Sequence, residues 1–199
     1  MAVADKQFVL ELPQRYEVVV AGDACATRDL KFGETTVPAA GVHARVAPPP
    51  EVAAELPGAR AHGQGQLRFL GLRIYDIRLW AEKRVAATDW PARPLALEIE
   101  YARELDGAAI AERSLKEMRR QAEIAPDTGG RWLEAMTRIF PDVRAGDRIT
   151  GVQRPGSGAR FFVNGRMQGE LTDAEFARLF FGIWLSPRTS EPALREALL

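Results

Sequence analysis

One apolar segment carries charged and hydroxyl side chains that could do chemistry. It runs from Leu72 to Trp80 and contains two arginines, an aspartate and a tyrosine. Burying an arginine or an aspartate is costly unless the charge is paired. One interpretation is an ion pair on an exposed strand face. The other is a ligand-lining strand with Arg73 and Tyr75 side by side, where the arginine binds a carboxylate or an oxyanion and the tyrosine shares the hydrogen bond.

A second candidate is the pair of carboxylates Glu98 and Glu100, which lie two residues apart on one predicted strand face. Their spacing is roughly 7 Å at the rise of a strand, which is compatible with acid–base catalysis. The residues between and beside them, Leu97 and Ile99, alternate toward the other face. This alternation favours the simpler interpretation, a solvated sheet face opposite a buried one.

Cofactor and metal motifs are weak in this chain. Gly63-Gln64-Gly65 is half of a dinucleotide fingerprint, but it precedes a predicted strand instead of following one, and we interpret it as strand entry. The two histidines, His43 and His62, are far apart, and Cys25 is the single cysteine. We therefore expect no cofactor and no metal site.

Composition excludes several classes of protein. Of 199 residues, 27 are Lys or Arg and 27 are Asp or Glu, so the net charge is zero, which argues against nucleic acid or anionic lipid as the main partner. No stretch approaches the ~20 apolar residues that span a bilayer, so we expect no stable membrane insertion. The N-terminus shows no signal peptide, which predicts a cytoplasmic protein as the sequence stands. Composition leaves the oligomeric state open.

The run Pro48-Pro49-Pro50 marks a domain boundary, because consecutive prolines form a stiff spacer. Residues 1–50 are predicted to be an N-terminal extension in which 8–12 and 16–21 could be strands. Residues 51–199 are predicted to be the main domain.

Strand patterns dominate the first half of the main domain and return near its end. Residues 66–70 and 72–81 read as two strands that break at Gly71, and 95–103 alternates cleanly. Further strands are predicted at 147–153, 160–163 and 166–171. The last two flank Asn164-Gly165, the strongest short signal for a hairpin, because a type I′ turn needs positive φ at both central residues.

Helical periodicity follows each group of strands. Asp106 is expected to cap a helix that runs to about Glu123, and a shorter helix is expected at 131–140. Thr172 is expected to cap a third helix with a wide apolar stripe, and Ser190 a last one. The order strands, helices, strands, helices predicts an α+β fold with helices packed on one face of an antiparallel sheet.

Several segments together resemble those of bacterial chalcone isomerase-like proteins. They are the runs at 63–80 and 111–120, Phe140-Pro141-Asp142-Val143 with 146–151, and 181–190. The resemblance covers roughly residues 51–199. It implies an open-faced β-sandwich, in which a layer of helices covers a large antiparallel sheet. Bacterial members usually carry an export signal, so the resemblance implies a periplasmic protein if the true N-terminus carries one.

The resemblance also carries expectations about the site. Plant chalcone isomerases close a flavanone ring by attack of a phenolate on an enone, with an arginine, a threonine, a tyrosine and an asparagine as polar groups. Arg68 falls nearest the position of the arginine, and Tyr75 falls where the threonine would be. The segment 111–120 offers neither the tyrosine nor the asparagine. Relatives of this fold include fatty-acid-binding and non-catalytic proteins.

Three hypotheses for function follow. The leading one is a non-catalytic binder of a small apolar carboxylate or phenol in the helix–sheet cleft, with Arg68, Arg73 and Tyr75 at its polar end. The second is an isomerase of the intramolecular lyase type that uses Arg68 and Tyr75. The third is a structural or partner-binding protein with a filled cleft. An empty apolar cavity beside Arg68 or Arg73 favours the first two, and a cleft packed with side chains favours the third.

We expect no appreciable cyclisation of hydroxychalcones. General acid–base catalysis and oxyanion stabilisation each contribute roughly 10²–10⁴-fold in rate, and binding without them does not accelerate the reaction. The measurement is the loss of chalcone absorbance with and without protein at equal pH. A protein-dependent rate that vanishes in Arg68→Ala would instead support the isomerase.

Overall fold

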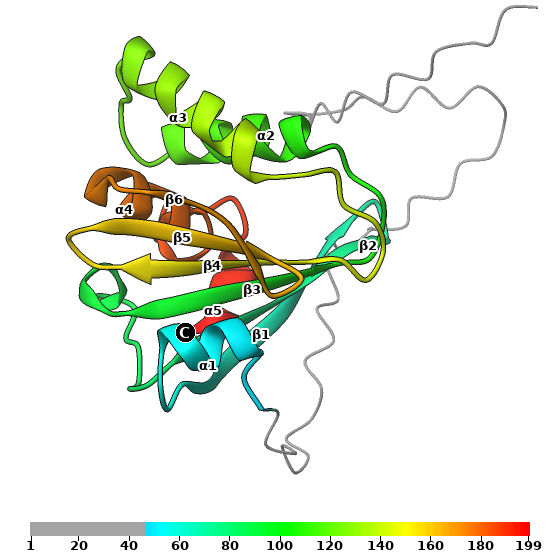
Figure 1. The fold of residues 1–199 in the computed structure, drawn as a ribbon, viewed down its shortest axis with the longest axis vertical. Coiled ribbons are helices and arrows are strands. Elements are labelled where there is room, and N and C mark those ends of the chain that lie inside the picture. The colour runs from blue at the N-terminus through cyan, green and yellow to red at the C-terminus, as the bar shows by residue number, and fades with distance from the viewer. Residues whose placement is uncertain (1–46) are drawn as a thin grey trace, which may run out of the picture. The chain divides into compact units, whose positions relative to one another are not determined.

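The core of the fold is a six-stranded antiparallel sheet in which each strand pairs with the next one along the chain (Figure 1). The computed structural model describes residues 47–199. The predicted strands at 8–12 and 16–21, and most of the proposed N-terminal extension, lie outside the described residues. The strands are β1 (Arg60–Phe69), β2 (Leu72–Ala81), β3 (Leu95–Tyr101), β4 (Arg148–Arg154), β5 (Gly158–Val163) and β6 (Arg166–Leu171).

Four helices form a layer on one face of this sheet. They are α2 (Gly107–Arg119), α3 (Pro126–Ile139), α4 (Ala174–Leu185) and α5 (Pro192–Leu198). Helix α4 lies on β4 and β5, α5 lies on β1, and α2 packs on α3 and α4. A short 3₁₀ helix, η1 (Trp90–Ala92), precedes β3. The predicted α+β class and the open-faced sheet with its helix layer are confirmed.

Alternation along the strands creates the buried face. On β3, Leu97, Ile99 and Tyr101 join the main core, as expected. They meet Ile77 and Leu79 of β2, which lie opposite Ile99 and Leu97 in the ladder. The helix-facing side of the sheet is therefore apolar across its central strands, and it can bury the apolar stripes of the helices.

One short helix on the opposite face was not anticipated. Helix α1 (Pro50–Glu55) begins at the last residue of the proline run, and its Val52 packs in a small second core with Trp80, Val152 and Phe162 of the sheet. Proline is well suited to the first turn of a helix, where its missing N–H has no partner to lose. The proline run therefore leads directly into a helix that covers part of the outer face.

Two glycines let α5 lie close to the sheet. A Cβ atom on Gly63 would collide with the backbone carbonyls of Ala197 and Leu198, and one on Gly65 would collide with the side chain of Leu194. Both glycines belong to β1. The interpretation of Gly63-Gln64-Gly65 as part of a strand is confirmed, and its glycines serve close packing.

Three helix starts differ from the sequence-based expectation. Helix α3 begins at Pro126 instead of at residue 131, again with proline in the first turn. Asp173, not Thr172, caps α4, and its carboxylate accepts hydrogen bonds from the amides of Glu175 and Phe176. Helix α5 has no side-chain cap, so the expected role of Ser190 is wrong. The sequence pattern does not decide which of two neighbouring cap residues begins a helix, or at which residue of the first turn the helix starts.

Phe180 is the central side chain between α4 and the sheet. Its ring contacts four other aromatic rings edge-on or tilted, with centroids 5.0–6.1 Å apart: Phe140, Phe161, Phe181 and Trp184. It also stacks on Phe176 at 5.5 Å. Such pairs add to the free energy gained by burying the rings.

We predict that Phe180→Ala lowers the free energy of unfolding by about 3–5 kcal/mol, because the truncation leaves a cavity among rings that other contacts hold in place. Denaturant unfolding followed by circular dichroism measures the change. Met167→Ala, on an exposed position of β6, is the control and should stay within about 0.5 kcal/mol of the original protein. A loss below about 1 kcal/mol for Phe180→Ala would contradict the proposed packing of α4.

Candidate functional site

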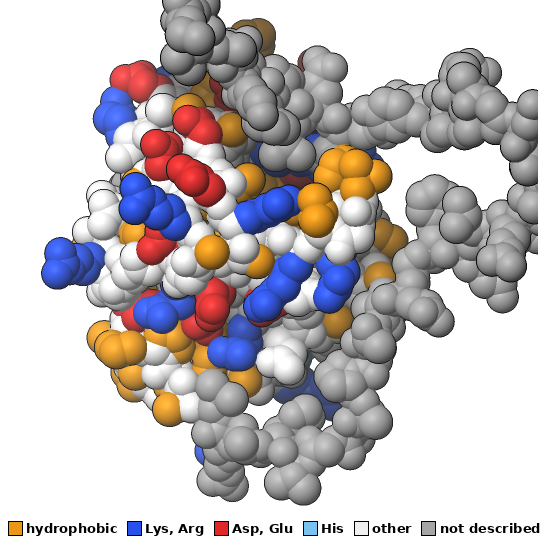
Figure 2. All heavy atoms as spheres, turned by 90° about the vertical axis from the view of Figure 1, so that its right-hand side faces the viewer, with side chains coloured by type: hydrophobic (Ala, Val, Ile, Leu, Met, Phe, Trp, Pro, Cys, Tyr) orange, Lys and Arg blue, Asp and Glu red, His pale blue; other side chains and the backbone are white. Residues whose placement is uncertain are grey.

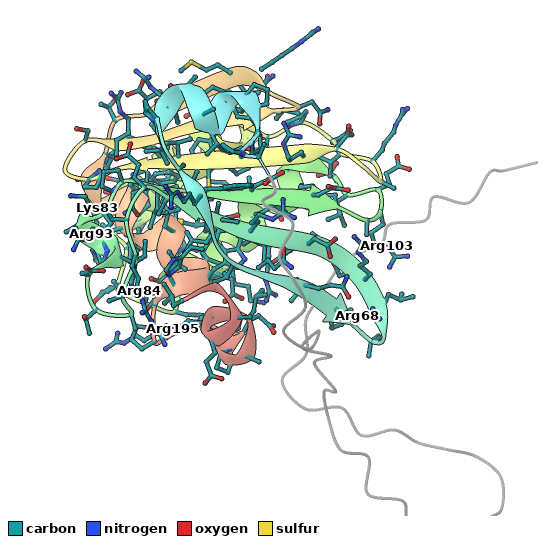
Figure 3. All side chains as sticks on the ribbon, turned by 90° about the horizontal axis from the view of Figure 1, so that it is seen from below. Arg68, Lys83, Arg84, Arg93, Arg103 and Arg195 are labelled. Atoms are coloured by element: carbon teal, nitrogen blue, oxygen red, sulfur yellow. The ribbon has the colours of Figure 1, made fainter. Side chains whose placement is uncertain are left out.

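Arg68 and Arg73 lie opposite each other at the turn end of the β1–β2 hairpin, an end that Figure 3 marks with Arg68. Arg73 forms an ion pair with Asp76, and Arg68 donates to the side chain of Gln66 at 2.6 Å. Gln66 in turn donates to Asp76 at 2.8 Å, so these four side chains form one partly exposed polar cluster. The ion-pair interpretation of the β2 segment is confirmed for Arg73 and Asp76.

Tyr75 points into the helix layer, away from this cluster. The ladder shifts register between Leu67 and Arg68, where β2 carries an extra residue, and Tyr75 pairs with Leu67. The indole N–H of Trp184 on α4 donates to the Tyr75 hydroxyl at 2.9 Å. Burial raises the pKa of this hydroxyl well above its ordinary value, an effect that the Trp184 hydrogen bond opposes. The register shift therefore keeps Tyr75 apart from Arg68 and Arg73.

Charged groups from two helices influence the Tyr75 hydroxyl. Arg113 and Glu117 of α2 form an ion pair at 2.6 Å, and Glu117 is buried. Burial raises the pKa of Glu191, at the start of α5, and Glu117 raises it further while Arg113 lowers it. Arg113 is thus already paired, and two carboxylates share the region. A ligand carboxylate would meet repulsion here.

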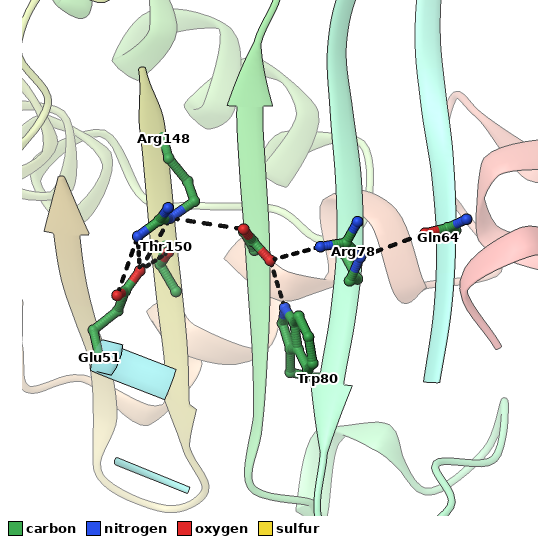
Figure 4. Close-up of polar contacts among 7 residues, drawn as sticks. Glu51, Gln64, Arg78, Trp80, Arg148 and Thr150 are labelled. Carbon is green, nitrogen blue, oxygen red and sulfur yellow. Dashed lines mark hydrogen bonds and ion pairs between the residues drawn. The ribbon is translucent and has the colours of Figure 1, made fainter. Parts of the chain in front are cut away.

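On the outer face, Glu98 is buried inside a network of hydrogen bonds and ion pairs (Figure 4). Its carboxylate accepts from Trp80 Nε1 at 2.6 Å and from Arg78 at 3.4 Å, and Arg148 lies at 3.7 Å. The expectation of a solvated face was therefore wrong for Glu98, although Glu100 is exposed. Cations on both neighbouring strands compensate the burial of the charge.

Helix α1 closes this network with Glu51. Two nitrogens of Arg148 donate to its Oε1 at 2.9 and 3.1 Å, and the Thr150 hydroxyl donates to the same oxygen at 2.8 Å. With Glu98 and Arg78, two carboxylates face two guanidinium groups, so the charges balance (Figure 4). Each carboxylate is satisfied within the chain, and the network serves to hold α1 on the sheet.

The structure also contains a groove between α2 and α3, with a volume of about 350 Å³. The residues that line it are Glu112, Leu115, Lys116, Arg119 and Leu133. Two cations, one carboxylate and two leucines line this concave surface, so its net charge is positive and it suits an amphiphile whose polar end is negative. The groove is open to solvent on one side, so a ligand bound there would stay partly exposed.

A glycine on the facing helix leaves room for the Arg119 guanidinium. A Cβ atom on Gly129 would lie 2.9 Å from Nη2 of Arg119, so the missing side chain leaves room for the guanidinium. Lys116 and Arg119 were not among the site residues predicted from the sequence. In the sequence, the signal was a predicted helix with Lys116 and Arg119 three residues apart and Leu115 beside them. The pair Gly129-Gly130 follows it.

Within residues 47–199, no group of three or more His, Cys, Asp or Glu side chains is arranged to hold a metal ion. In the same part of the chain, the helices are too short or too polar to cross a bilayer.

A model of the family described as chalcone isomerase-like matches residues 62–199. The chain belongs to this family, as the fold and the sequence resemblance indicated.

Two other proteins are similar to this chain, one in sequence and one in fold. An uncharacterized protein of Haemophilus influenzae is 28% identical over 137 residues, which cover 69% of this chain and 66% of that protein. A fatty-acid binding protein of Arabidopsis thaliana has a similar structure, with a TM-score of 0.55 and 12% identity over 71% of this chain and 86% of that chain. The second likeness is one of fold.

We predict that Tyr75 and Trp184 are energetically coupled. Trp184→Phe removes the donor to a partly buried hydroxyl and should cost about 1–2 kcal/mol of stability. In a Tyr75→Phe background the hydroxyl is gone, so the same substitution should cost less. A double-mutant cycle in denaturant measures the difference. Additive losses would show that the two side chains do not interact.

Proposed function

We propose that this domain binds a small apolar carboxylate in the α2–α3 groove, with Lys116 and Arg119 at the carboxylate and Leu115 and Leu133 along the apolar chain. The observation that carries the proposal is the groove itself, whose lining combines two leucines with two cations and one carboxylate, Glu112, so that the cations outnumber the carboxylate. A charge-assisted hydrogen bond to either cation would fix the polar end.

The helix–sheet layer is packed with side chains, the result expected of a protein with a filled cleft, so the proposal places the ligand in the groove and not in that cleft. Phe161, Phe176 and Phe180 pack against one another between α4 and the sheet, and Trp184 hydrogen-bonds to Tyr75 in the same layer. The alternative, a ligand in the helix–sheet cleft beside Tyr75, would require these side chains to separate. A ligand in the α2–α3 groove requires no such rearrangement.

The family supports a binding role. The chain has a chalcone isomerase-like domain, and a protein of the same fold from Arabidopsis thaliana is a fatty-acid binding protein. Under this proposal Arg68 and Arg73 have no part in the groove, because they belong to the polar cluster with Gln66 and Asp76.

We predict saturable binding of decanoate that depends on the two cations. Isothermal titration below the micelle concentration should show that Lys116→Gln/Arg119→Gln weakens decanoate about tenfold or more, the loss of a charge-assisted hydrogen bond. Decanol, which lacks the carboxylate, should bind both proteins alike. Arg131→Gln on α3 removes a charge outside the groove lining and is the matched control.

Two outcomes would contradict this proposal. If decanoate does not bind saturably, the proposed binding function is wrong. Decanoate binding that survives in the Lys116/Arg119 variant and is lost in Tyr75→Phe would move the site to the helix–sheet layer.

A further inference from the structure

The turn of the β1–β2 hairpin presents two leucines to solvent. Leu70 is 85% exposed and Leu72 is 51% exposed, and only Met167, at 52%, joins them as a large exposed apolar side chain in residues 47–199. Phe69 adds a third, partly buried apolar side chain at the same turn. Exposed apolar side chains so close together at one tip are unusual for a surface that contacts water alone.

The backbone of this turn makes the leucine more unusual. Leu70 and Gly71 have φ values of 49° and 76°, while Asn164 and Gly165, at the β5–β6 turn, have 49° and 82°. Asparagine visits this left-handed region readily, whereas a leucine there is strained. The same chain thus uses the preferred residue in one turn and a disfavoured one in the other. Neither turn geometry nor core packing accounts for Leu70.

Basic side chains surround the leucines. Arg68 and Arg73 flank the tip, and Arg68 also donates to the Gly71 carbonyl at 3.4 Å, across the turn. Arg103 lies at the same end of the sheet, because the amide of the preceding Ala102 donates to Ile74 of β2 (Figure 3). Figure 2 shows hydrophobic and Lys or Arg side chains next to one another on this side of the molecule. Asp76 forms an ion pair with Arg73, and the exposed carboxylate of Glu100 also lies near this guanidinium, so Arg68 and Arg103 are the cations that the proposal uses.

We propose that this hairpin tip inserts into the surface of a lipid bilayer, with Leu70 and Leu72 at the boundary of the acyl chains and Arg68 and Arg103 among the lipid phosphates. This peripheral contact is reversible and is distinct from a membrane span. Because the net charge of the chain is zero, the leucines provide the main attraction and anionic lipid strengthens it.

The shape of the tip favours lipid over a protein partner. A stable protein interface buries about 800 Å² on each side, on a surface of matched shape. A two-residue turn that contains Leu70 and is followed by Leu72 is far smaller than such a surface. A bilayer needs no matched shape, because its acyl chains adapt to each inserted side chain.

The test measures binding of the full chain to vesicles of phosphatidylcholine with and without phosphatidylglycerol, by co-sedimentation. Leu70→Asn should reduce the partition coefficient about tenfold or more, the loss expected when one leucine side chain no longer leaves water. Its melting temperature should be equal to or above that of the original protein, because asparagine suits the turn. Met167→Asn removes an equally exposed apolar side chain elsewhere and should bind vesicles normally. Arg68→Gln/Arg103→Gln should lose the gain from phosphatidylglycerol.

Three results would overturn the proposal. They are a protein that does not bind either vesicle, a Leu70→Asn variant that binds as well as the original, and a Met167→Asn variant that loses as much binding. Sedimentation without lipid reports the competing role, contact with a second copy of the chain. A self-association that Leu70→Asn abolishes, without vesicle binding, would assign the tip to that contact.

Discussion

The packing of α4 on the sheet is the interaction on which the rest of the structure depends. Phe176 and Phe180 on one side of the helix meet Phe161 of β5, and Trp184 reaches Tyr75 of β2. Because α2 packs on α4, and α3 packs on α2, the position of the groove follows from this first contact. The aromatic layer is therefore a platform for the candidate site and occupies the space that a ligand would need beside Tyr75.

The opposite face of the sheet contains buried charges. Glu51 and Glu98 are buried carboxylates that share Arg148, and hydrogen bonds from Thr150 and Trp80 complete their contacts. Removing one member would leave an uncompensated buried charge, which is costly. The intact network adds little to the stability of the fold, because its attraction mainly offsets the cost of burying the charges. Helix α1 is attached to the sheet through this network and through its own small apolar cluster.

The sequence predicted the elements better than it predicted the site. Alternation around Leu97 and the Asn164-Gly165 turn identified strands and a hairpin because both signals are local. The Arg73 and Tyr75 pair could not be judged in this way, because one extra residue in β2 places the tyrosine on the helix side. The burial of Glu98 depends on Arg78 and Arg148 from two other strands, and only the sheet register brings them together. The groove was missed for a similar reason, since it requires the packing of α2 against α3.

The central claim is that a small apolar carboxylate occupies the groove between α2 and α3. The most direct measurement is a crystal structure of the protein with 2-bromodecanoate, in which anomalous scattering locates the bromine next to the carboxylate. The account predicts a bromine peak beside Lys116 and Arg119, with the chain along Leu115 and Leu133. A peak in the layer between Tyr75 and Trp184, or next to Arg68, would contradict it.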